Sequence, residues 1–371
     1  MSQAVSPDRV GGHWLRRVNF RKVGIFFVSL FLFILAIQLL KSGAKILVPF
    51  IRNGLAVHNA WNALGFGWLF AYLVLSGSPV AATALTFFDA GAIDRLGTFA
   101  MIAGSRFGAS FIVLALGFVY TLRGHERKVS LAMGLLSLLV TYTIYIPAML
   151  VGYGLLQIPA FNRLHPAAAQ SGLNSVMDLI FNPLVAFINN LFAALLPKTG
   201  AQMGVFLLGF GVLWYSLNLI DESLPNMKLK ESAFSGMARM LYRPIVTFAL
   251  GAGITSITMS VSVSLSLLVP LSARGYIRRE NVIPYIMGAN ITTFIDTLVA
   301  SLLIPNPGAF TVVLAEMLSV ALVSLLLLAF AYRPYERAVL RAAEVIGEAR
   351  RNLIVFLLVI VAAPVALMLV K

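Results

Sequence analysis

The chain has 371 residues, of which 60% are hydrophobic and only 11% are charged. Soluble globular proteins carry about 25% charged residues, so this composition excludes an ordinary soluble protein and also a disordered chain. The formal net charge is +14, but the basic residues lie in short stretches between apolar runs, which is typical of membrane loops and not of a nucleic-acid surface. The chain contains no Cys, and its four His residues follow no metal-ligand spacing.

Long runs without charge predict transmembrane helices. The run between Arg52 and Asp89 has 36 residues and the run between Lys128 and Arg163 has 34, whereas a helix needs about 20 residues to cross a bilayer. The first apolar run follows the basic residues 1–23 and is expected to be a retained helix, not a signal peptide. The sequence therefore predicts an all-α polytopic membrane protein with spans near 24–40, 98–120, 129–156, 203–220, 281–303, 308–332 and 352–370.

Two long apolar regions, 63–90 and 244–273, are interrupted near their centres by Ser-rich stretches. An apolar segment broken at its centre is typical of a re-entrant hairpin or a pair of half-helices. The apolar segment 172–197 contains Asp178 and several Asn residues, and its sequence fits a span, a hairpin or an interfacial helix. Residues 333–351 have charges on a helical period and are expected to form a surface helix.

The distribution of Lys and Arg predicts that the N-terminus lies on the cytoplasmic side of the membrane. We expect this membrane to be a bacterial inner membrane or a plasma membrane. With the two hairpins returning to their own sides, most basic residues become cytoplasmic. The expected organisation is a cytoplasmic segment 1–23, a first transporter repeat 24–120, connecting helices 121–202, a second repeat 203–303, and C-terminal helices 304–371 that include the cytoplasmic surface helix 333–351.

An internal repeat relates residues 76–114 to residues 260–298 at an ungapped offset of 184. Each copy has a Ser-x-Ser break, a Gly at the next turn and a Gly-containing break in the following span. The predicted topology enters the two copies from opposite sides, which gives an inverted-topology repeat, the plan of many secondary transporters. The identical pairs are Ser76/Ser260, Ser78/Ser262, Gly91/Gly275, Ile93/Ile277, Arg95/Arg279, Ile102/Ile286, Gly104/Gly288 and Leu114/Leu298.

These motifs resemble those of the sodium-dependent phosphate cotransporter family (type II Na⁺/phosphate symporters), which has two Gln-Ser-Ser-Ser hairpins, each followed by a Gly-Ala-Asn-Ile-Gly-Thr-Thr helix break. The resemblance covers about residues 24–303, including the leading helices 31–42 and 210–223. It implies two inverted repeats with re-entrant or broken helices that meet at the membrane centre, phosphate as substrate, sodium as coupling ion and no other cofactor. The matching stretches are Leu75–Ser78 with Gly104–Ala109, and Met259–Ser262 with Gly288–Thr293.

The chain also departs from the family pattern. Leu75 and Met259 replace both glutamines, each Ser triplet has lost its middle member, and Arg106 replaces the amide of the first Gly-Ala-Asn motif. The resemblance therefore supports the family's fold for this chain more strongly than it supports the family's substrate. The leading hypothesis is a sodium-coupled carrier of phosphate or a related small anion. Alternatives are a divergent carrier or exporter of another small anion, coupled to protons or uncoupled, and a non-transporting membrane scaffold or sensor. No enzyme motif accompanies these features, so an enzyme is not expected.

The candidate binding residues are polar groups near the two breaks, where free N–H groups attract anions and free oxygens coordinate sodium. The alternative for each hydroxyl is close helix packing or a bond to its own helix. Arg106 is expected to clamp an oxyanion, to replace a bound sodium, or to pair with Asp296; Asp296 and Glu316 are the intramembrane acids that fit a proton or sodium site. The expected site consists of Ser76, Ser78, Arg106, Ser260, Ser262, Asn290, Thr292, Thr293 and Asp296.

Overall fold

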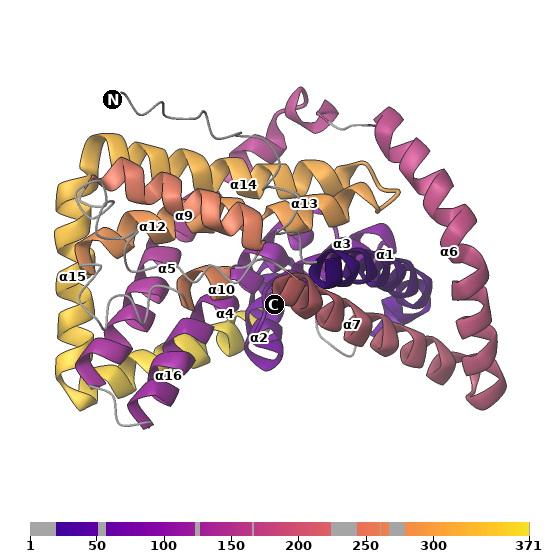
Figure 1. Ribbon diagram of the computed structural model, residues 1–371, viewed down its shortest axis with the longest axis horizontal. Coiled ribbons are helices and arrows are strands. Elements are labelled where there is room, and N and C mark those ends of the chain that lie inside the picture. The colour runs from indigo at the N-terminus through magenta and orange to yellow at the C-terminus, as the bar shows by residue number, and fades with distance from the viewer. Residues whose placement is uncertain are drawn as a thin grey trace, which may run out of the picture.

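The computed structural model describes residues 20–50, 57–122, 127–164, 167–223, 243–259, 261–266 and 279–370, which are mostly helical (Figure 1). The first half contains α1 (Phe20–Pro49), α2 (Ala60–Val74), α3 (Ser78–Asp89), α4 (Arg95–Leu122), α5 (Arg127–Gln157), η3 (Phe161–Arg163) and α6 (Ala167–Leu195). The second contains α7 (Lys198–Ser223), α9 (Pro244–Thr258), α10 (Val261–Ser266), α12 (Arg279–Thr292), α13 (Ile295–Leu302), α14 (Gly308–Leu326), η4 (Leu327–Ala331), α15 (Tyr332–Glu348) and α16 (Arg350–Met368).

Eight helical stretches in the described parts are long and apolar enough to cross a membrane, so the protein is an integral, multi-pass membrane protein. Each of the seven predicted spans overlaps one of these stretches. The eighth is Ser175–Leu195 within α6, which is one continuous helix, so the hairpin alternative for 172–197 is wrong. Polar residues of α6 hold it against α1: Asn189 donates to Ser42 Oγ (2.9 Å) and Gln38 donates to Asp178 Oδ1 (3.5 Å).

Both predicted interruptions of the long apolar regions are present. The helix α2 ends where Leu75 adopts a left-handed backbone (φ 52°), and α3 begins at Ser78 with a proline in its first turn. In the second region α9 ends where Met259 adopts the same conformation (φ 51°), and α10 begins at Val261. Leu and Met in this conformation are strained, because their Cβ approaches the following carbonyl oxygen.

The same helix packing recurs in the two copies at the offset of 184. A methyl group on any of four helix glycines would overlap a carbonyl oxygen of the partner helix, so the backbones of α2 and α4, and of α9 and α12, lie in direct contact. The glycine and carbonyl pairs are Gly67 with Met101 and Gly104 with Leu64 in the first copy, and Gly251 with Tyr285 and Gly288 with Phe248 in the second. Each glycine and each carbonyl residue of the first copy lies 184 residues before its counterpart in the second copy.

The predicted break in the span after each hairpin is present only in the second copy. There α12 ends at Thr292 and α13 begins at Ile295, whereas α4 is continuous through 104–109. In α4 the hydroxyls of Ser105 and Ser110 donate to carbonyls three residues back in the same helix, so they do not interrupt it. The expectation of a break near Gly104 was therefore wrong.

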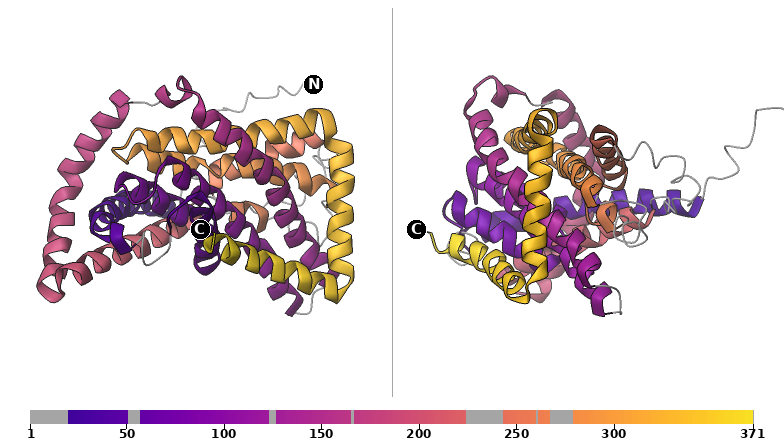
Figure 2. Two further views of the ribbon diagram at one scale, coloured as in Figure 1. Left: turned by 180° about the vertical axis from the view of Figure 1, so that it is seen from behind. Right: turned by 90° about the vertical axis from the view of Figure 1, so that its left-hand side faces the viewer.

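The C-terminal helices form one side of the molecule. Figure 1 shows α9, α12, α13 and α14 running alongside one another, while α15 crosses their ends and α6 lies at the opposite edge. Figure 2 shows the same crossing from behind and from the side. The separate helix predicted for 333–351 is therefore present as α15.

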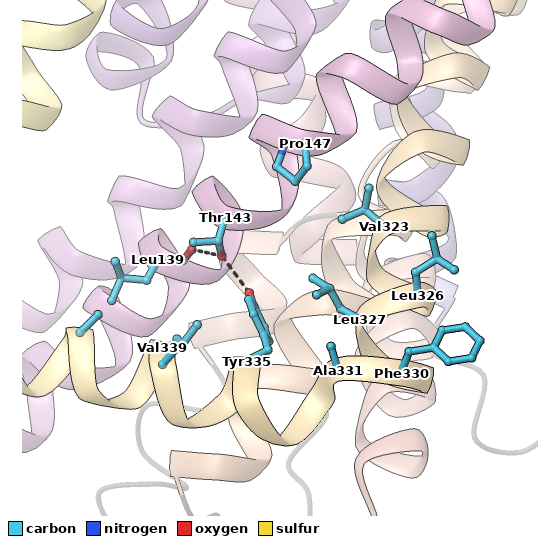
Figure 3. Close-up of a pocket in the computed structure, with 12 residues that line it drawn as sticks. Leu139, Thr143, Pro147, Val323, Leu326, Leu327, Phe330, Ala331, Tyr335 and Val339 are labelled. Carbon is cyan, nitrogen blue, oxygen red and sulfur yellow. Dashed lines mark hydrogen bonds between the residues drawn. The ribbon is translucent and has the colours of Figure 1, made fainter.

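A hollow of about 680 Å³ lies between α5, α14, η4 and α15 (Figure 3). Leu, Val, Ala and Phe side chains line most of it, and its polar feature is a 2.8 Å hydrogen bond between Thr143 Oγ1 and Tyr335 Oη. No charged side chain lines this hollow among the described residues. An apolar wall of this kind suits lipid chains and not an inorganic anion.

Candidate functional site

A second, much smaller cavity is polar and lies where the first chain break meets the second copy. Its lining comes from the α2–α3 turn, α4, α5, α10, α12 and the link between α12 and α13. Five of the predicted site residues line it: Ser76, Ser78, Arg106, Asn290 and Thr293. The remaining lining residues are Gly77, Ala109, Ser110, Thr141, Tyr145 and Val261.

Arg106 is the centre of this cavity, and its side chain is 5% exposed. Its Nη1 lies 3.5 Å from both Ser78 Oγ and Thr293 Oγ1, and its Nη2 donates to Thr297 Oγ1 at 2.6 Å. Asp296 Oδ1 is 3.6 Å from Nη2, so the ion pair considered from the sequence is present. Arg106 thus connects α4 with the start of α3 and with the broken region of the second copy.

Gly77 lies in the turn before α3, close to α4. A methyl group at Gly77 would approach Ser105 O of α4 to 2.9 Å and Arg106 Nη1 to 3.4 Å. A side chain at Gly77 would therefore clash with α4 at Ser105 O and at Ala109 Cβ (3.0 Å), so the glycine lets this turn lie against α4.

Asn290 is positioned by α5, a helix that no sequence motif pointed to. The side-chain Nδ2 of Asn290 donates to Thr141 Oγ1 at 3.2 Å, and the backbone carbonyl oxygen of Asn290 accepts a hydrogen bond from Tyr145 Oη at 3.1 Å. The sequence analysis missed Thr141 and Tyr145, because isolated hydroxyls in an apolar span carry no pattern. It also missed Thr297, which donates its hydroxyl to Asp296 Oδ1 and is adjacent to it in the chain.

Two other predicted residues, Thr292 and Asp296, do not line the cavity. Thr292 donates its hydroxyl to Ala252 O of α9 at 2.9 Å, so it joins two helices and does not line the site. Asp296 is 4% exposed and borders the site through Arg106. Ser260 lies outside the described residues, and Ser262 lies in α10 with a side chain that the structure does not describe.

The charge and size of the cavity define what it can do. Hydroxyls and a guanidinium give it donors for an oxyanion, and the first turn of α3, whose N–H groups have no intrahelical partner, begins at its wall. Its volume of about 30 Å³ suffices for water. A tetrahedral oxyanion with four oxygens needs more room than this cavity has between the described residues.

Comparison with known proteins identifies the C-terminal part. Residues 226–350 match the family model Na⁺/Pi-cotransporter, and this range includes α9, α10, α12, α13, α14 and α15, together with the Gly288–Thr293 motif. No curated protein and no solved structure matches the chain. The family is one of transporters and not of enzymes. Residues 226–350 of this multi-pass helical membrane protein are therefore similar to the Na⁺/Pi-cotransporter family, as the resemblance of the second copy's motifs predicted.

Proposed function

We propose that the protein is a secondary transporter that couples sodium to the movement of inorganic phosphate or a related small oxyanion. The observation that carries this proposal is the polar cavity in which Arg106 links the first chain break to the second copy, within a chain that has a Na⁺/Pi-cotransporter domain. The common offset of the breaks and of the glycine contacts supports two related halves. In this proposal the halves are inverted repeats whose broken helices meet at the membrane centre and alternate access to the site.

The anion is proposed to bind at Arg106. A guanidinium offers two parallel donors to an oxyanion, and it is a stronger and more specific partner than an ammonium group. Ser78 adds a hydroxyl and begins α3, so the positive end of the helix dipole faces the same place. Arg106 Nε has no hydrogen-bond partner among the described residues, so one donor is free for substrate.

Sodium is proposed to bind on the side of the second copy, away from Arg106. The positive charge of Arg106 disfavours a cation beside it, whereas α9 ends with the negative end of its helix dipole in the second copy. At this end of α9 the backbone N–H of Met259 donates a hydrogen bond to Thr255 O at 2.7 Å. Oxygens at such a helix end are the ligands that transporters of this plan use for sodium.

Radiolabelled phosphate uptake into proteoliposomes, with and without an inward sodium gradient, tests the proposal. We expect uptake that the gradient stimulates. Ser78→Ala should weaken phosphate affinity about fivefold, because one hydroxyl contact contributes about 1 kcal/mol. Ser256→Ala is the matched control, since the Ser256 hydroxyl donates to Gly253 O within α9. Uptake independent of sodium would favour the proton-coupled or uncoupled carrier, and failure to bind or move any oxyanion would favour the scaffold.

A further inference from the structure

One buried acid lies next to the site and is not used by the proposed binding of phosphate or sodium. Glu316 is the only charged residue of α14, and its side chain is 0% exposed. Neither carboxyl oxygen has a hydrogen-bond partner among the described residues. The backbone of Ala103 on α4 and the guanidinium of Arg106 are the groups that interact electrostatically with this carboxyl group.

The two Nη groups of Arg106 already have partners in this conformation. The guanidinium contacts Asp296, Thr297, Thr293 and Ser78, and none of its nitrogens forms a hydrogen bond to Glu316 among the described contacts. One cation therefore faces two acids, and it pairs with Asp296. An ionised carboxylate buried without a partner is very costly, and a group in that position is neutral instead.

Among the described residues, Arg106 is the one cation that interacts with Glu316. Arg106 on α4 and Tyr145 on α5 are the titratable groups that interact with it electrostatically. The other helices packed against α14 carry Asp296 on α13, Asp89 on α3, Arg163 on η3 and Glu280 on α12 among the residues whose side chains are described. None of these four is an electrostatic partner of Glu316.

We propose that Glu316 is a proton-binding residue and that it shares Arg106 with Asp296. While Arg106 pairs with Asp296, the carboxyl group of Glu316 holds a proton. When Arg106 turns from α13 to α14, Glu316 releases its proton to water and becomes the ionised partner, and Asp296 takes up a proton from water. The net charge of the three groups stays constant, and the position of the proton follows the contact between α4 and α13. This inference rests on the proposed transport function and adds a coupling proton to it.

Infrared difference spectroscopy of the full-length protein in lipid nanodiscs tests the protonated state directly. A neutral carboxylic acid has a C=O stretching band that a carboxylate lacks. We expect such a band at pH 7, its loss in Glu316→Gln, and its retention in Glu344→Gln, which changes an exposed acid of α15. Glu316→Asp keeps an acid at this position and should shift the band without removing it. A spectrum of folded Glu316→Gln identical to that of the unchanged protein would overturn the proposal.

Coupling is tested in proteoliposomes that contain a pH-sensitive dye. We expect an imposed phosphate gradient to move protons in the unchanged protein, and we expect Glu316→Gln to exchange phosphate at equilibrium while proton movement falls at least tenfold. Equal proton movement per phosphate in Glu316→Gln would overturn the coupling role. If the unchanged protein moves no phosphate, the proposed transport function fails, whereas the infrared band still decides whether Glu316 holds a proton.

Discussion

Arg106 makes contacts that a lysine cannot reproduce. Its two terminal nitrogens reach Ser78 on α3 and Thr297 on α13 at the same time, and a single ammonium group reaches only one of these sides. We therefore expect Arg106→Lys to weaken phosphate binding at least tenfold, measured by titration calorimetry on the purified protein. Retention of the original affinity in a well-folded Arg106→Lys protein would instead mean that charge alone is needed, as in the replacement of a bound sodium. In that case Arg106→Asn should increase the dependence of transport on sodium.

The ion pair with Asp296 makes a second prediction at the same residue. Arg106→Ala leaves Asp296 buried without a cation and should lower the free energy of unfolding by about 3–5 kcal/mol, whereas adding Asp296→Ala should recover most of this loss. Thermal unfolding in nanodiscs measures the stability, and phosphate uptake measures the function of the same proteins. Recovery of stability without recovery of uptake is expected for an anion clamp, and recovery of both would show that Arg106 only neutralises Asp296.

At the scale of helices, the glycine contacts predict opposite effects for two substitutions on α9. Gly251→Ala would place a methyl group on the carbonyl oxygen of Tyr285 and push α9 from α12, so we expect a loss of about 1–3 kcal/mol. Gly253→Ala is the control two residues away. No described atom lies within 4 Å of its added methyl group, and alanine in a helix interior should stabilise by about 0.5–1 kcal/mol. Similar melting temperatures for the two variants would contradict the tight pairing of α9 and α12.

The helix elements were largely predictable from the sequence, and the exceptions have physical causes. Charge-free length identified the spans, and Ser-rich centres identified both breaks, because neither signal depends on tertiary contacts. The continuity of α4 was not predicted, since the Gly-Ser-Arg stretch resembles a break and only its hydroxyl bonds within the helix show otherwise. The left-handed Leu75 and Met259 were also unpredicted, because this conformation usually belongs to Gly.

At the scale of the whole molecule, the sequence predicted which segments meet but not every helix that surrounds the site. The repeat offset brought Ser78, Arg106 and Thr293 into one site, and the cavity contains all three. The contribution of α5 was not predictable, because Thr141 and Tyr145 lie in an ordinary apolar span. The close approach of Gly77 to Ser105 O on α4 was also not predictable, because it depends on how the turn packs against α4.

The last prediction concerns alternating access and membrane orientation. Because the chain contains no native cysteine, a single introduced cysteine can be labelled specifically. Ser76 lines the polar cavity, so a carrier that opens to both sides should expose it to each side in turn. We expect Ser76→Cys to react with a membrane-impermeant maleimide both in right-side-out and in inverted vesicles. Arg333→Cys, on the exposed face of α15, should react from the cytoplasmic side alone and serves as the control for sidedness. Modification of Ser76→Cys from one side only, under phosphate gradients of either direction, would contradict alternating access and would favour a scaffold or sensor with a pocket open to that side.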